Sequence, residues 1–114
     1  MDGFSKRWTI QDRDGNPIYL TQERWDHIVA NHPEMADYEE HLKTTLQRGR
    51  RRQEPLNPRK YRYPFPFDDL PEDHNHVVAI VLFGFDVDEQ GRTLPNNFVA
   101  TAFMKHIHGK GDRQ

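Results

Sequence analysis

The longest apolar run of the chain, residues 76–85 (HVVAIVLFGF), constrains the fold more than any other segment. It is rich in β-branched residues and has no regular polar alternation, which is typical of a strand buried on both faces. It is far shorter than the roughly 20 apolar residues that a membrane-spanning helix needs. The run therefore predicts the central strand of a sheet, and residues 98–103 are predicted as its antiparallel neighbour.

Residues 22–32 change to a helical period, and their spacing separates two histidines. The apolar side is formed by Trp25, Ile28, Val29 and His32. His27 falls on the opposite side of the same helix, together with Arg24 and Asn31. The spacing predicts that His32 faces the sheet, where an ordinary hydrogen-bonded core or cap histidine explains it as well. His27 is predicted to face outward, where it is either an ordinary solvated side chain or a general base.

The remaining pattern supplies a hairpin, a second helix and short strands. Residues 8–10 and 18–20 flank a turn-rich spacer, which predicts an N-terminal hairpin. A second helix is expected from about residue 33 to Arg48, where Gly49 stops it, and a short strand is expected within residues 50–57.

The predicted fold class is α+β, with an N-terminal hairpin and two helices packed on a C-terminal antiparallel sheet of three to four strands. A chain of 114 residues is expected to form a single domain, with flexible ends at about residues 1–6 and 106–114. The start of the chain has no apolar segment behind its charges, so a cytoplasmic protein is expected.

Charge and cysteine content narrow the chemistry. The chain has no cysteine, which excludes disulfides, thiolate zinc sites and cysteine nucleophiles. The formal net charge is −2, so there is no overall basic field for nucleic-acid binding. Seven cations nevertheless fall within fifteen residues: Arg48, Arg50, Arg51, Arg52, Arg59, Lys60 and Arg62. One basic face is therefore expected.

Residues 59–63 (RKYRY) alternate in the manner of a strand with two different faces. Lys60 and Arg62 share one face, where they could grip a phosphate. Arg59, Tyr61 and Tyr63 share the other, where a base or ribose could stack. An ordinary solvated edge strand explains the same pattern equally well.

Two further features are weaker when taken alone. Thr101 is the only polar residue in residues 98–103, and its hydroxyl could donate to a phosphate or an imidazole, although threonine is also simply a good strand residue. His106 and His108 could lie on one side of an extended chain, but metal sites need three or four ligands. We expect no metal and no other cofactor, and metal-dependent hydrolysis at this pair is the competing interpretation.

The order of these parts resembles a known nuclease group. The pattern Trp25-x-His27-Ile28-x3-His32-Pro33-Glu34, a second helix, residues 59–63, residues 77–82 and residues 98–103 resembles small phage- and mobile-element-associated members of the barnase/EndoU/colicin/RelE-like nuclease superfamily. The resemblance covers roughly residues 18–104. It implies a metal-independent, toxin-like endoribonuclease that acts on RNA by 2′-hydroxyl attack on the adjacent phosphate.

The resemblance also implies roles for individual residues and for partners. His27 or His32 would serve as base or acid, and Thr101 would orient the phosphate. Lys60 and Arg62 would hold that phosphate. The strand's other face, carrying Arg59, Tyr61 and Tyr63, would bind substrate by stacking or donation. The implied partners are RNA and a cognate antitoxin or immunity protein, with no membrane.

The net charge of −2 departs from the basic character of many such toxins. The alternative hypothesis is therefore a non-catalytic interaction module on the same fold, antitoxin-like or regulatory. Its acidic loops at residues 68–73 and 86–89 would bind a basic protein.

Overall fold

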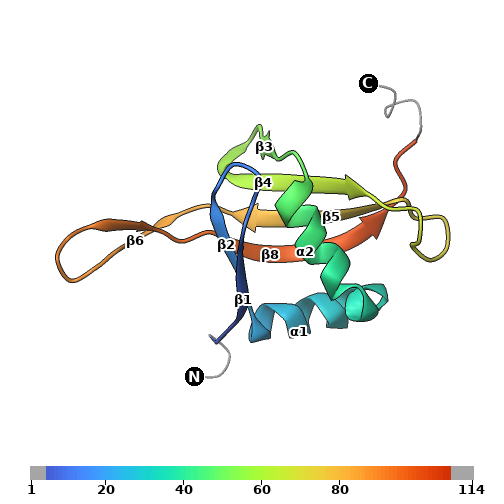
Figure 1. Cartoon of the computed structure of the whole chain (residues 1–114), viewed down its shortest axis with the longest axis horizontal. Helices are drawn as coiled ribbons and strands as arrows, with labels where there is room; N and C mark the ends of the chain where they lie inside the picture. The colour runs from blue at the N-terminus through green and yellow to red at the C-terminus, as the bar shows by residue number, and fades with distance from the viewer. Residues whose placement is uncertain (1–4, 109–114) are drawn as a thin grey trace.

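The computed structural model describes residues 5–108 and confirms the α+β class. Two α-helices and a 3₁₀ helix accompany eight strands, in the order β1 (Lys6–Gln11), β2 (Pro17–Thr21), α1 (Gln22–Asn31), η2 (Pro33–Asp37), α2 (Glu39–Arg48), β3 (Arg52–Glu54), β4 (Asn57–Pro66), β5 (His76–Leu82), β6 (Phe85–Val87), β7 (Thr93–Pro95) and β8 (Phe98–Lys105). Six of the strands form one sheet in the order β1-β2-β8-β5-β4-β3 (Figure 1). The sheet is therefore larger than the predicted three to four strands.

The sheet is larger because the N-terminal hairpin joins it instead of packing on it. β1 and β2 pair antiparallel as predicted, and β2 then lies parallel to β8 through Tyr19 and Phe98. At the other edge, the short β3 pairs antiparallel with β4. β5 occupies an interior position between β8 and β4 and is antiparallel to both, which confirms the two strands predicted from residues 76–85 and 98–103.

The connection between β5 and β8 also contains strands. β6 and β7 form a separate two-stranded sheet, in which Phe85 pairs with Pro95 and Val87 with Thr93. Figure 1 shows this hairpin extending away from the main sheet along the long axis of the molecule. The sequence predicted a loop at residues 86–89 and included Phe85 in the preceding strand, whereas β5 ends at Leu82 and Phe85 begins β6. Three-residue strands with no buried side give little hydrophobic signal.

The helical region breaks at Pro33. A residue that precedes proline is disfavoured in the helical conformation, and His32 accordingly has φ −135° and ψ 73° and caps α1. The expected second helix divides into η2 and α2 on either side of Tyr38. α2 ends before Gly49, where a Cβ would lie 2.9 Å from the Pro64 carbonyl oxygen, so this close approach to β4 requires glycine.

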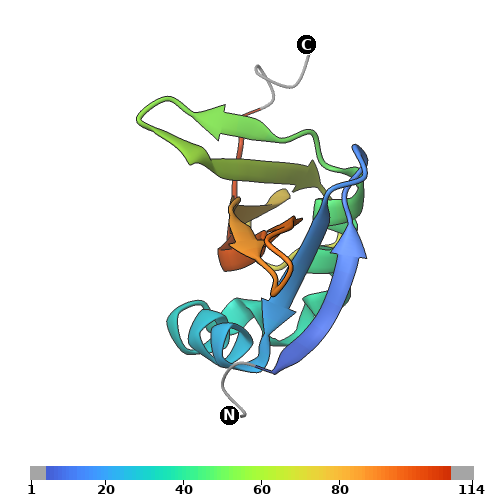
Figure 2. The same ribbon diagram turned by 90° about the vertical axis from the view of Figure 1, so that its left-hand side faces the viewer.

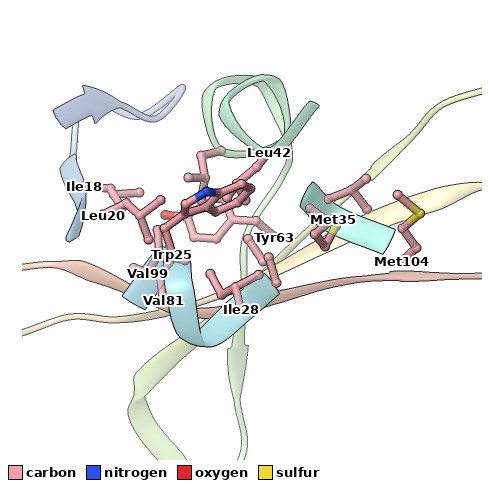
Figure 3. Close-up of a cluster of buried hydrophobic side chains, with 14 residues drawn as sticks. Ile18, Leu20, Trp25, Ile28, Met35, Leu42, Tyr63, Val81, Val99 and Met104 are labelled. Carbon is pink, nitrogen blue, oxygen red and sulfur yellow. The ribbon is translucent and has the colours of Figure 1, made fainter. Parts of the chain in front are cut away.

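One face of the sheet carries the hydrophobic core (Figure 3). α2 covers this face through Leu42 and Leu46, and α1 contributes Trp25 and Ile28. Tyr63 of β4 is the largest fully buried side chain. The core faces of all these elements therefore meet on a single side of the sheet.

The ends of the chain bear on two further expectations. Residues 1–4 and 109–114, part of the predicted flexible ends, lie outside the described residues. Ile107 exchanges two hydrogen bonds with the Asn75 side chain, at 2.8 and 2.9 Å, so the segment after β8 is attached to the body. Neither α-helix of the described chain has the length and apolar character that crossing a bilayer requires.

Candidate functional site

A cleft of about 470 Å³ lies on the open face of the sheet, between α1 and β4. Figure 2 shows α1 and the β3–β4 hairpin flanking this side of the molecule, with α2 on the other side. The cleft is lined from four parts of the chain by Arg24, His27, Asn31, His32, Asn57, Lys60, Ile80, Leu82, Ala100 and Thr101. Four predicted site residues thus border the same space: His27, His32, Lys60 and Thr101.

The α1 wall is the stripe that helical spacing predicted to face outward. Arg24, His27 and Asn31 recur at intervals of three and four residues and lie on one side of the helix. The opposite side is anchored in the core through Trp25 and Ile28. Burial of those two residues orients the polar stripe toward the cleft.

His32 reaches the same cleft by a different route. It lies at the cap of α1, so its side chain does not follow the helical spacing that would place it opposite His27. Its ring centroid is 5.7 Å from that of Phe103, and Nδ1 is 3.8 Å from a Glu34 carboxylate oxygen. The two histidines therefore border one cleft, although the spacing predicted opposite sides.

The floor of the cleft depends on the register of the sheet. Ile80 pairs with Arg62 on β4 and with Thr101 on β8, so these three residues form a row across the strands. The next pair joins Val81 to Val99, which leaves Ala100 as an extra residue in a β-bulge. Because of this bulge, the adjacent Ala100 and Thr101 both border the cleft.

The cleft is cationic even though the whole chain is slightly acidic. Of the described residues that line it, none is acidic, and Arg24 and Lys60 supply fixed positive charges. Neither side chain has an ion pair with a described residue. The ion pairs of lysine and arginine lie elsewhere: Arg7–Glu39, Lys43–Glu40, Arg51–Asp14 and Arg92–Asp88. This distribution leaves the cleft cations available to an anionic ligand.

The other predicted substrate-binding residues do not reach the cleft. Arg59 and Tyr61 line a second pocket of about 630 Å³ with Phe83, on the opposite side of β4. Arg59 Nε donates to the Phe83 carbonyl oxygen at 2.8 Å, and the Tyr61 and Phe83 ring centroids are 4.6 Å apart. Tyr63 has no exposed surface. Arg62 shares the cleft face of β4 with Lys60 but lies beyond the cleft lining.

The Tyr63 hydroxyl makes a buried hydrogen bond that no sequence pattern predicted. It donates to Asp12 Oδ2 at 2.6 Å, and Asp12 is only 5% exposed. Burial, and then the Asp12 carboxylate, raise the pKa of Tyr63 far above its usual value. Burial also acts to raise the pKa of Asp12, but hydrogen bonds from Tyr63 and Asn16 outweigh it, so that pKa is lowered. The pair ties the β1–β2 turn to β4.

The histidines near the end of β8 do not form part of a larger ligand cluster. The His106 and His108 ring centroids are 5.2 Å apart, and His106 Nδ1 bonds to the Asp73 carbonyl oxygen at 2.8 Å. Within residues 5–108, no three His, Cys, Asp or Glu side chains are grouped so that they could hold a metal ion.

Comparison of the chain with protein-family models, with curated proteins and with solved structures finds no match. The function of the cleft is therefore inferred from its own residues.

Proposed function

We propose that the protein is a metal-independent, toxin-like endoribonuclease. The observation that supports this proposal is the convergence of His27, His32, Lys60 and Thr101 in one cleft that no acidic residue lines. Two imidazoles beside unpaired cations are the groups needed to move protons around a phosphodiester and to stabilise its negative charge.

The two histidines would divide the proton transfers between them. One neutral imidazole accepts the proton of the RNA 2′-hydroxyl, and the resulting oxygen attacks the adjacent phosphorus. The other, protonated imidazole gives its proton to the 5′-oxygen as the bond between phosphorus and that oxygen breaks. The products are a 2′,3′-cyclic phosphate and a free 5′-hydroxyl. Because the RNA supplies the nucleophile, the protein needs no nucleophilic side chain of its own.

The remaining cleft residues would stabilise the pentacovalent state. Lys60 and Arg24 place positive charge where the non-bridging oxygens gain negative charge. The Thr101 hydroxyl can donate a hydrogen bond to one of these oxygens. The apolar floor formed by Ile80 and Leu82 lowers the local dielectric, which strengthens each of these interactions.

The test is cleavage of a fluorescent single-stranded RNA in EDTA. The wild type is expected to release a cyclic-phosphate product, and His27→Ala and His32→Ala are each expected to lower the rate about 10²- to 10⁴-fold. His108→Ala is the matched control, because His108 is exposed and lies outside the cleft lining. Absence of cleavage by the wild type, or equal cleavage by all variants, would refute the proposal. A requirement for added metal would favour metal-dependent hydrolysis instead.

A toxin-like ribonuclease acts where cellular RNA lies, so we place this activity in the cytoplasm. An unrestrained nuclease would damage its own cell, and the proposal therefore includes a cognate antitoxin or immunity protein. Co-expression with genes adjacent to its own, scored by recovery of growth, tests for such a partner.

A second candidate function, a non-catalytic protein-binding module, is favoured by the β6–β7 hairpin. Phe85 is 75% exposed and Val87 is 68% exposed on this projecting element, which also carries Asp86. Exposed apolar side chains of this kind often mark protein interaction sites. This function predicts a stoichiometric basic partner in a native pull-down, its loss in a Phe85→Ser/Val87→Ser variant, and no RNA cleavage.

A further inference from the structure

Two arginines face each other on adjacent strands beside the cleft. Arg52 of β3 is the direct cross-strand partner of Arg62 of β4. Side-chain alternation places them on the same face of the sheet as Lys60, two residues before Arg62. Like charges directly opposite each other destabilise a sheet, and neither arginine has an acidic partner among the described residues. The repulsion is therefore left uncompensated by the protein.

The structural requirements of β3 do not explain this pair. Charged side chains commonly protect an edge strand from pairing with other chains, which accounts for Arg52 alone. Arg62 lies on β4, which has neighbours on both sides, and its side chain is half-buried. The neighbouring Arg51, in contrast, is compensated by Asp14 and packs on the Tyr61 ring at 4.4 Å. Arg51 is thus compensated by a carboxylate, whereas Arg52 and Arg62 on the cleft face are not compensated within the described part of the chain.

The position of the pair relates it to the cleft. Arg62, Ile80 and Thr101 are consecutive cross-strand partners, so Arg52 extends the same row to the edge of the sheet. Residues two apart on a strand are separated by roughly 6.6 Å, and neighbouring strands by roughly 4.8 Å. An anion between Arg52 and Arg62 would therefore be distinct from one held at Lys60, yet next to it.

We infer that Arg52 and Arg62 bind a second phosphodiester of a single-stranded RNA, adjacent to the scissile phosphate in the cleft. This inference rests on the proposed function and defines its substrate class as a polynucleotide, not a mononucleotide or a cyclic nucleotide. One phosphate bound between the two guanidinium groups offsets their cross-strand repulsion. It also accepts charge-assisted hydrogen bonds from both arginines.

Binding can be measured without cleavage, using a fluorescein-labelled hexanucleotide of 2′-O-methyl RNA, in which the nucleophile is blocked. Arg52→Ala and Arg62→Ala are each expected to weaken binding about 10-fold. The double variant is expected to reduce the slope of log affinity against log salt by about 0.7, one phosphate contact. Arg48→Ala removes the same charge from α2, on the opposite face, and should leave binding within about twofold.

A charge reversal separates a binding role from a structural one. Arg52→Glu replaces repulsion by an ion pair with Arg62, so the melting temperature is expected to rise by about 2 to 4 °C while hexanucleotide binding falls at least 10-fold. If the arginines served the fold alone, the variant would change stability and leave binding unaltered. That result would overturn the inference.

Cleavage of a dinucleotide, which has only the scissile phosphate, distinguishes failure of this inference from failure of the proposed function. Arg52→Ala should lower kcat/KM for an unmodified hexanucleotide and leave kcat/KM for the dinucleotide unchanged. Equal effects of the variant on both substrates would refute the second phosphate site while the ribonuclease stands. Wild-type hexanucleotide binding that depends on both arginines, without any cleavage, would refute the ribonuclease while the RNA-binding site stands. Absence of wild-type binding refutes the inference.

Discussion

The polar groups on the two faces of β4 differ in whether the protein itself supplies their partners. On the core face, the Tyr63 hydroxyl is fully buried and its hydrogen bond to Asp12 is satisfied within the protein. On the open face, Lys60 and Arg62 have no acidic partner among the described residues. A fully buried polar group without a partner costs more stability than a partly exposed cation that has no acidic partner but still contacts water. Alternate residues of one strand therefore serve the fold and the proposed site separately.

Removal of the Tyr63 side chain from the core is expected to have the largest effect on stability. Tyr63→Ala should lower the free energy of unfolding by about 3 to 5 kcal/mol, because it leaves a cavity and removes the hydroxyl that donates to Asp12. Urea denaturation measures the loss. A loss below 1 kcal/mol would show that β4 contributes little to the core.

Lys60→Met tests the open face, where we expect a large loss of activity instead of a large loss of stability. It should lower kcat/KM for RNA about 10²- to 10³-fold through loss of phosphate stabilisation. The free energy of unfolding should change by less than about 0.5 kcal/mol, because Lys60 makes no ion pair with a described residue. Lys60→Arg keeps the charge and should retain more activity. Equal losses of stability for Lys60→Met and Tyr63→Ala would contradict the separation of the two faces.

Tyr63→Phe keeps the buried ring and removes only the hydroxyl, with an expected cost of about 1 to 2 kcal/mol. The stabilities of the wild type and of Tyr63→Phe are also expected to depend differently on pH in the alkaline range. Because the folded pKa of Tyr63 is raised, its contribution is complete below the unfolded pKa of about 10 and is lost as pH rises above it. Unfolding measured between pH 9 and 11 should therefore show a slope up to about 1.4 kcal/mol per pH unit shallower for Tyr63→Phe than for the wild type.

At acid pH the same variant tests the partner carboxylate. The folded pKa of Asp12 is lowered, so its stabilising contribution is present above the unfolded pKa of about 3.9 and is lost as pH falls through the folded value. In Tyr63→Phe, which lacks the hydroxyl donor, the pKa of Asp12 is expected to be lowered less than in the wild type. The stability difference between wild type and Tyr63→Phe should therefore narrow below about pH 4. A constant difference down to pH 2 would show that the hydrogen bond does not influence Asp12.

Thr101→Val gives the smallest expected effect. Valine has nearly the shape of threonine and suits a strand, so the free energy of unfolding should change by less than about 0.5 kcal/mol. Loss of one hydrogen bond to the phosphate should lower kcat/KM about 5- to 10-fold. Single-turnover kinetics measure this change, and an unaltered rate would remove Thr101 from the site.

Sequence patterns predicted those parts of the molecule that depend on nearby residues. The apolar run at 76–85 predicted β5, and the helical spacing separated the Trp25 side of α1 from the polar stripe that includes His27. His32 contacts the sheet through Phe103, as the spacing predicted, but it lines the same cleft as His27, because Pro33 ends α1 before His32. Arg24 and Asn31 share the polar stripe of His27, and this shared stripe is the sequence signal for the cleft wall.

Local sequence patterns are enough to predict the α+β class, the alternation of β4 and the polar stripe of α1, since periods of two and 3.6 residues are local properties. Only the folded chain pairs Arg52 with Arg62, brings the Tyr63 hydroxyl to Asp12, and sets α1 and β4 on either side of one cleft. These contacts depend on strand register, on the bulge at Ala100 and on the parallel pairing of β2 with β8. Each joins residues far apart in the chain, and their pairing is set by the packing of the whole core, which no local pattern encodes.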